Sequence, residues 1–168
     1  MKPASTPMQS SAPLSPSAQK VQEALKALGV ACTVIEMSRT TRSAQDAART
    51  VGCEVAQIAK SLVFEGAWSH RALLVITSGA NRVDETVIGA AVAEPVLKAE
   101  AEFVRCKTGF AIGGVPPVGH TENLTIFIDE DLMAHAEIWA AAGTPQAVFK
   151  LTPRELQKIT SGRVVRVK

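Results

Sequence analysis

The sequence lacks any long apolar run. No stretch approaches the roughly 20 apolar residues that a helix needs to cross a bilayer. Residues 1–18 consist mostly of Ser, Pro, Ala, Thr and Gln, without the continuous apolar core of a secretory signal. We therefore expect residues 1–16 to form a flexible tail and residues 17–168 to form one domain of a cytoplasmic protein that has no membrane partner.

Cysteine is also scarce. The chain has three cysteines, Cys32, Cys53 and Cys106, which are widely spaced and form no CxxC pair, and no histidine cluster lies near them. This pattern indicates neither a disulfide framework nor a zinc site. We expect no metal and no other cofactor, and we interpret the cysteines as small packing residues in a reducing compartment.

An excess of charge of either sign is missing as well. The 168 residues include 18 Lys plus Arg against 16 Asp plus Glu, which gives a net charge of +2. That value excludes a protein that coats nucleic acid non-specifically, but it allows a local basic patch. Hydrophobic residues at 46% and charged residues at 20% indicate one soluble globular domain with a real core.

Apolar periodicity and turn residues predict the order of the elements. Helices are expected at 17–28, 44–51, 54–58, 84–91 and 99–106 and from 153 onward, with Ser17, Ser43 and Thr152 as caps. Strands are expected at 30–37, 60–64, 72–77, 110–112, 124–128, 138–141, 147–151 and 163–167. Because strands outnumber helices and mostly follow one another as hairpins, we predict an α+β fold with a mixed, largely antiparallel sheet curled round a core.

Residues 109–120 form the most constrained stretch, with four glycines and two prolines in twelve positions. Glycine allows close approach to the main chain and proline fixes φ, so the stretch is more typical of a ligand-holding loop than of a plain turn. The N–H groups of Gly113, Gly114 and Val115 could bind an oxyanion, whereas Pro116 and Pro117 add only rigidity. An elaborate crossover between strands is the alternative.

A single lysine stands out, because Lys60 carries a charge where an apolar strand begins. Its ammonium could bind a phosphate or a carbonyl oxygen. A lysine whose stem covers an edge of the sheet while its charge reaches water is the ordinary alternative.

Three segments carry a resemblance: residues 60–64, 81–84 and 108–120. In this order they closely resemble the YbaK/EbsC family of editing domains associated with prolyl-tRNA synthetase, including free-standing relatives, over residues 17–168. The resemblance implies an α+β fold and an aminoacyl-tRNA deacylase that acts in trans. Its substrate would be mischarged tRNA, bound at the acceptor end, and prolyl-tRNA synthetase is an implied partner.

The same resemblance implies the site residues. The family's lysine matches Lys60, its glycine–proline loop matches residues 113–117, and an acidic residue after the next strand matches Asp129. A loop of small residues that borders the amino-acid pocket matches Ala142, Gly143, Thr144 and Pro145. Relatives specialised for alanine look to have a histidine there, which this chain lacks and which argues against the alanine-specific branch. The resemblance implies cysteine, or a similar small amino acid, on proline tRNA as the leading expectation.

No nucleophile can be identified, since the sequence has neither a Gly-x-Ser-x-Gly elbow nor a convincing Cys/His pair. The hypothesis is that a ribose hydroxyl or a substrate thiol assists the attack. His120 is a candidate substrate-binding residue with an ordinary hydrogen-bonding role as the alternative, and Asp129 could equally cap a helix. Basic residues that could grip the acceptor stem, or be ordinary solvated charges, are Arg39, Arg42, Arg49, Arg163, Arg166 and Lys168.

A second function from another class stays open. A domain of the same fold could bind tRNA or a synthetase without catalysing a reaction. The presence of both Lys60 and the intact 109–120 loop favours the enzyme, because a docking domain has no need of the two together.

Overall fold

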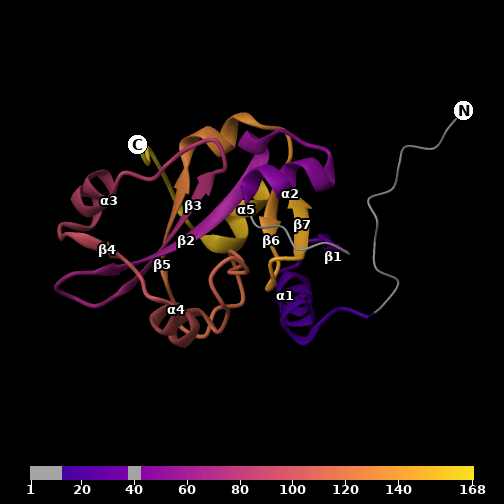
Figure 1. The fold of residues 1–168 in the computed structure, drawn as a ribbon, viewed down its shortest axis with the longest axis horizontal. Coiled ribbons are helices and arrows are strands. Elements are labelled where there is room, and N and C mark those ends of the chain that lie inside the picture. The colour runs from indigo at the N-terminus through magenta and orange to yellow at the C-terminus, as the bar shows by residue number, and fades with distance from the viewer. Residues whose placement is uncertain (1–12, 38–42) are drawn as a thin grey trace, which may run out of the picture.

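The computed structural model describes residues 13–37 and 43–168 of the chain (Figure 1). The helices are α1 (Pro16–Ala27), α2 (Ala44–Val51), α3 (Glu85–Val92), α4 (Ala101–Thr108) and α5 (Pro153–Thr160), with 3₁₀ turns η1 (Val55–Gln57) and η2 (Glu130–Ala134). The strands are β1 (Val34–Glu36), β2 (Ile58–Gly66), β3 (Ala72–Ser78), β4 (Val96–Lys98), β5 (Thr125–Asp129), β6 (Ile138–Ala141), β7 (Ala147–Leu151) and β8 (Arg163–Val165). None of the described helices is long and apolar enough to cross a membrane.

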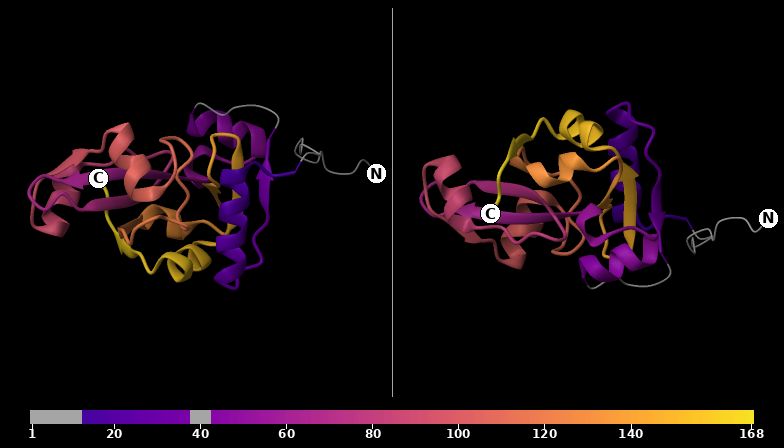
Figure 2. Two further views of the ribbon diagram at one scale, coloured as in Figure 1. Left: turned by 90° about the horizontal axis from the view of Figure 1, so that it is seen from below. Right: turned by 90° about the horizontal axis from the view of Figure 1, so that it is seen from above.

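All eight strands form one sheet in the order β1-β7-β6-β2-β3-β5-β8, with β4 paired to β2 outside this path. Four of the seven pairings are antiparallel and three are parallel. Strand β2 runs through the middle of the molecule, with α3 and β4 at one end and α1, β1 and β7 at the other (Figure 1). The views in Figure 2 agree with this elongated arrangement. The predicted α+β fold with a mixed sheet is confirmed.

Local capping accounts for the well-predicted helix starts. The Ser43 hydroxyl accepts a hydrogen bond from the Asp46 N–H at the start of α2, and Thr152 forms a reciprocal capping box with Glu155 at the start of α5. Both caps follow the expected side-chain chemistry. The predicted cap of the first helix is wrong, because Ser15 caps α1 and Pro16 is its first residue.

Two strand predictions fail, each for its own reason. The segment 110–112 is not a strand, since the Phe110 N–H bonds to the Thr108 hydroxyl and the Ala111 carbonyl accepts from Gly114. These local bonds use the backbone groups that a sheet would need. Strand β4 was not predicted, and its three residues are held by pairing with β2, a long-range contact that no local pattern indicates.

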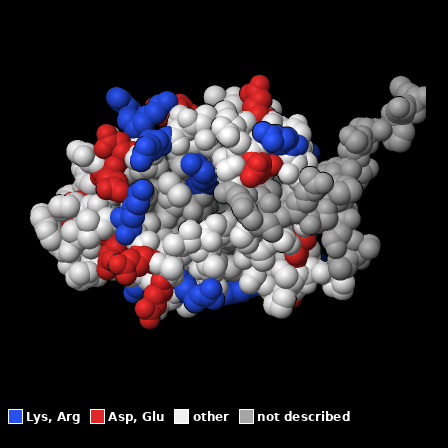
Figure 3. Space-filling view, viewed as in Figure 1, with Lys and Arg blue, Asp and Glu red and all other residues white. Residues whose placement is uncertain are grey.

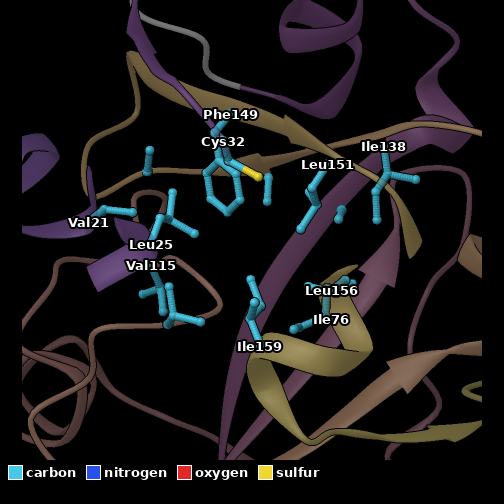
Figure 4. Packing of buried hydrophobic residues seen from close by; sticks show 14 of the residues in the cluster. Val21, Leu25, Cys32, Ile76, Val115, Ile138, Phe149, Leu151, Leu156 and Ile159 are labelled. Atoms are coloured by element: carbon cyan, nitrogen blue, oxygen red, sulfur yellow. The ribbon is translucent and has the colours of Figure 1, made fainter. Parts of the chain in front are cut away.

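The main core lies between α1, the sheet and α5 (Figure 4). Val21 and Leu25 of α1 belong to the same buried cluster as Phe149 of β7 and Leu156 of α5. Val115, from the glycine–proline loop, is part of this cluster and is itself buried. The loop is therefore anchored in the core.

Strand β2 has one continuous edge and one interrupted edge. Along one edge it pairs with β3 from Ala59 to Glu65. Along the other it pairs with β6 at Ile58 and Ala59 and with β4 from Phe64 to Gly66. Between these two pairings, residues 60–63 have no strand partner along this second edge in the described part of the chain. This gap in the sheet positions the site.

Candidate functional site

A cavity of about 560 Å³ lies against β2. This volume is within the range of small-molecule sites, roughly 300–1,000 Å³. Its walls are β2, the start of α2, the turn 81–83, the ends of β4 and β6, the start of β7, residues 112, 113 and 115, and residues 144 and 145. Segments that are far apart in the sequence therefore line the same cavity.

Small side chains make the room for this cavity. Seven alanines from five parts of the chain line it: Ala44, Ala47, Ala59, Ala99, Ala140, Ala141 and Ala147. The lining alanines of α2, Ala44 and Ala47, have short side chains that let the helix lie close to its neighbours. Their short side chains also leave space for the cavity on the side of α2.

Positive charge dominates the cavity lining. Lys60, Arg82 and Lys98 line it, against a single carboxylate, Glu85. None of the salt bridges found among residues 13–37 and 43–168 involves any of the three cations. Elsewhere basic and acidic side chains are interspersed on the face shown in Figure 3. The cavity lining thus carries a local excess of positive charge on a protein of almost neutral net charge.

The glycine–proline loop reaches the same cavity. Gly113 and Val115 line it, and the N–H groups of both are without a hydrogen-bond partner among the described residues. Gly113 has φ of +91°, a conformation that favours glycine. The Gly114 N–H, however, donates to the Ala111 carbonyl at 3.0 Å, so the prediction that it is free to bind an oxyanion is wrong.

Gly114 instead joins the two predicted loops. Its carbonyl accepts a hydrogen bond from the Gly143 N–H at 2.9 Å. Thr144 and Pro145 line the cavity, whereas Ala142 and Gly143 lie behind it, Ala142 being fully buried. Pro116 and Pro117 are also buried and do not line the cavity.

Gly114→Ala is expected to separate these loops. A Cβ there would lie 2.8 Å from Thr144 Cα and 2.9 Å from the Gly143 carbonyl carbon, which is too close to backbone that cannot rotate away. We expect kcat/KM for any reaction in the cavity to fall at least about tenfold, since small displacements of positioning groups are costly. Steady-state kinetics on folded protein measures this change.

The matched variant is Gly29→Ala. Gly29 also has positive φ, at +77°, but a Cβ added there would have nothing within 4 Å. It should lose about 1 kcal/mol of stability and no activity. Equal activity of the Gly114 and Gly29 variants would contradict the proposed role of the loop junction.

His120 makes a hydrogen bond within the 109–120 loop and lies outside the cavity. Its Nε2 lies 2.6 Å from the Pro116 carbonyl, to which it donates, and it is not part of the lining. Burial lowers the pKa of His120; the hydrogen bond to Pro116 opposes this shift, and the charge of Lys20 adds to it. The neutral ring is therefore the form that the folded protein holds.

The stability of the folded protein should depend on pH through the protonation of His120. Below the ordinary pKa of 6.5 the unfolded chain binds a proton at this residue while the folded chain resists it, so stability is complete above pH 6.5 and falls as the pH drops toward the lowered folded value. His120→Gln should flatten this part of the stability profile, measured by urea unfolding between pH 5 and 7.5. His70→Gln, at an exposed position, is the control. Parallel profiles for wild type and His120→Gln would contradict the prediction.

Asp129 lies beneath the cavity wall rather than in it. Its side chain is 1% exposed. Oδ2 accepts from the Thr77 hydroxyl, the Ser78 N–H and the Asn81 amide, and Oδ1 accepts from the Asp131 N–H. Asp129 therefore caps η2, which is one of the two roles that the sequence suggested for it. It also accepts a hydrogen bond from the side chain of Asn81, which lines the cavity.

Of the remaining predicted positions, Arg42 and Arg39 lie outside the described residues. Sequence reasoning gave no role to Arg82, Lys98 or Ser61, which line the cavity with Lys60. Arg82 was part of a recognised segment, but Lys98 ends a strand that was not predicted.

Comparison with known proteins places this geometry in a family. The family model described as the aminoacyl-tRNA editing domain matches residues 38–159, which include Lys60, the glycine–proline loop and the 142–145 loop. The chain belongs to this family of aminoacyl-tRNA editing domains. It is 27% identical over 131 residues to the uncharacterized protein YwhH of Bacillus subtilis (strain 168), a match covering 78% of this chain and 83% of that protein.

Solved structures of other proteins are also similar to this editing domain. A crystal structure described as a proposed trans-editing enzyme for prolyl-tRNA synthetase is 48% identical, with a TM-score of 0.89, covering 93% of this chain and 99% of that one. The hypothetical protein APE2540 is 29% identical, with a TM-score of 0.82, covering 88% of this chain and 98% of that one. The fold is therefore that of the family.

Proposed function

We propose that this editing domain is a free-standing aminoacyl-tRNA deacylase that hydrolyses the ester of a mischarged tRNA. The observation that carries the proposal is the meeting of Lys60 with Gly113 and Val115 at one cavity, from positions more than fifty residues apart. The cation and the free N–H groups supply the two interactions that the reaction needs, anion binding and stabilisation of charge on the carbonyl oxygen.

The reaction adds the oxygen of water to the ester carbonyl carbon. Negative charge then develops on the carbonyl oxygen, where the N–H groups of Gly113 and Val115 can donate to it. The bond to the terminal ribose breaks, the ribose oxygen takes a proton, and free amino acid leaves with uncharged tRNA. Lys60, with Arg82 and Lys98, holds the terminal phosphates or polarises the carbonyl.

Ser43, Ser61 and Thr144 carry hydroxyls and line the cavity, but among the described residues no histidine lines it as a base that could activate them. His120 is committed to the Pro116 carbonyl, and its lowered pKa comes from burial rather than from a catalytic partner. We therefore assign assistance of the attack to the substrate, through the neighbouring ribose hydroxyl or, for a cysteinyl substrate, its thiol. Cysteine on proline tRNA is the substrate proposed, with prolyl-tRNA synthetase as the enzyme whose errors are corrected.

Turnover tests the proposal. Catalytic amounts of the protein are incubated with tRNAs charged with cysteine, alanine, serine or threonine, and release of free amino acid is followed over many equivalents. We expect cysteine to be released fastest from proline tRNA. Stoichiometric binding of tRNA without release would overturn the enzyme and favour the non-catalytic binding module.

A further inference from the structure

The cavity runs along the edge of β2, not over its face. Seven consecutive residues, from Ile58 to Phe64, line it. Successive side chains of a strand point to opposite faces, so a cavity over one face would be lined by alternate residues only. Continuous lining places the cavity at the gap between β6 and β4, where the edge of residues 60–63 opposite β3 lacks a partner strand in the described chain.

The hydrogen bonds on either side of the gap fix which backbone groups point into it. The Ile58 carbonyl accepts from Gly79 and the Gly66 N–H donates to Arg71, so both residues face β3. In an antiparallel ladder the direction alternates along the strand. Ser61 and Val63 therefore point their backbone groups away from β3, and the Val63 carbonyl does accept from the Ala99 N–H on that side.

Ser61 is left with polar groups that nothing in the described protein satisfies. Its backbone carbonyl and N–H point into the gap, where the described residues place no strand to pair with. Its hydroxyl oxygen is buried and has no hydrogen-bond partner in the described residues. A buried polar group without a hydrogen-bond partner is destabilising unless a partner is supplied, and Ser61 lines the cavity from which a ligand could supply one.

We propose that Ser61 binds the α-amino group of the amino acid carried by the substrate, an inference that rests on the proposed deacylase function. An α-ammonium donates hydrogen bonds, and the Ser61 carbonyl and hydroxyl accept them. Three cations line the same cavity, so an ammonium needs acceptors set apart from them.

Alternation along β2 provides that separation. The Ser61 side chain is on the face of Ala59 and Val63, which belong to the main core cluster together with Val115. The Lys60 side chain is on the opposite face. The substrate is then oriented with its phosphates toward Lys60, Arg82 and Lys98, and with its amino acid toward Ser61 and the glycine–proline loop.

Binding of non-hydrolysable analogues tests Ser61 without requiring turnover. The 3′-terminal trinucleotide of tRNA is prepared with an alanyl, a lactyl or a propionyl group in amide linkage to the terminal ribose, and titrated by calorimetry. The alanyl analogue should bind at least about tenfold more tightly than the propionyl analogue, which lacks the amino group. The lactyl analogue, with one donor, should lie between them.

Variants at the same position separate amino-group binding from a structural role. Ser61→Ala should weaken binding of the alanyl analogue several-fold and leave the propionyl analogue unchanged, and Ser61→Thr should restore it because the hydroxyl is kept. Equal affinity for alanyl and propionyl analogues, equal weakening of both by Ser61→Ala, or no measurable binding of the alanyl analogue would each overturn the inference.

The two proposals fail in different ways. If no charged tRNA is hydrolysed while the alanyl analogue binds in a Ser61-dependent manner, the deacylase function falls and the amino-group site stands. If tRNA is turned over while wild type binds alanyl and propionyl analogues equally, the assignment of Ser61 falls alone.

Discussion

Lys60→Ala should lower kcat/KM for deacylation by about 10²- to 10³-fold, the usual effect of removing a group that stabilises developing charge. The Lys60 ammonium forms no salt bridge within residues 13–37 and 43–168, so its charge is available to the ligand. Initial rates of amino-acid release at subsaturating charged tRNA measure the change directly.

Three further variants define what Lys60 contributes. Lys60→Met keeps most of the apolar stem and removes the charge, so it should lose as much activity as alanine if charge is the contribution. Lys60→Arg keeps the charge with another shape and should retain part of the activity. Lys158→Ala, on the exposed side of α5 and away from the cavity, should be unchanged.

The split between kcat and KM assigns the contact. A loss confined to KM would indicate binding of a phosphate, whereas a loss in kcat would indicate contact with the reacting carbonyl. Full activity of Lys60→Ala would remove the cationic cavity from the mechanism, and with it the observation on which the proposed deacylase rests.

Elements governed by neighbouring residues could be predicted from the sequence. The caps at Ser43 and Thr152 and the β2–β3 hairpin depend on side chains within a few positions of one another, and the structure has all three. The 110–112 segment has apolar residues like a strand, but Gly109 at φ of +82° turns the chain just before it. Here local backbone bonds prevailed over the apolar pattern.

The geometry of the site depends more on contacts between residues far apart in the sequence than these elements do. Lys60 and the glycine–proline loop could be named because their residue types are unusual for a strand start and for a plain turn. The open edge of β2 could not be predicted, since it exists only because β6 and β4 pair with the two ends of the strand. Among the described residues, the middle of the strand then has β3 on one edge and no partner strand on the other. For that reason Ser61, an ordinary strand serine in the sequence, was not singled out.

The other large effect is expected at Asp129, where Asp129→Ala should lower the free energy of unfolding by about 3–5 kcal/mol. The substitution leaves four donors without their acceptor, from Thr77, Ser78, Asn81 and Asp131. Thr77 and Ser78 are buried, so water cannot easily replace the lost bonds. Urea unfolding at neutral pH measures the change.

Asp129→Asn and Asp84→Ala are the matched variants. Asparagine keeps the size of the side chain but turns an amide donor toward one of the N–H groups, so it should lose less stability than alanine. Asp84 caps α3 through the Thr86 N–H at an exposed position, and its loss should cost only about 1 kcal/mol. If Asp129→Ala were no worse than Asp84→Ala, the buried network would not be a main support of the fold.

Asp129 should also influence the cavity through Asn81, even though it does not line it. The Asn81 amide donates to both Asp129 and Asp131, and Arg82 follows directly on the cavity wall. Loosening Asn81 should displace the Arg82 guanidinium and raise KM for charged tRNA more than it lowers kcat, because Arg82 is proposed to bind phosphate. Assays below the unfolding transition of Asp129→Asn measure this split, and an unchanged KM would limit Asp129 to supporting the fold.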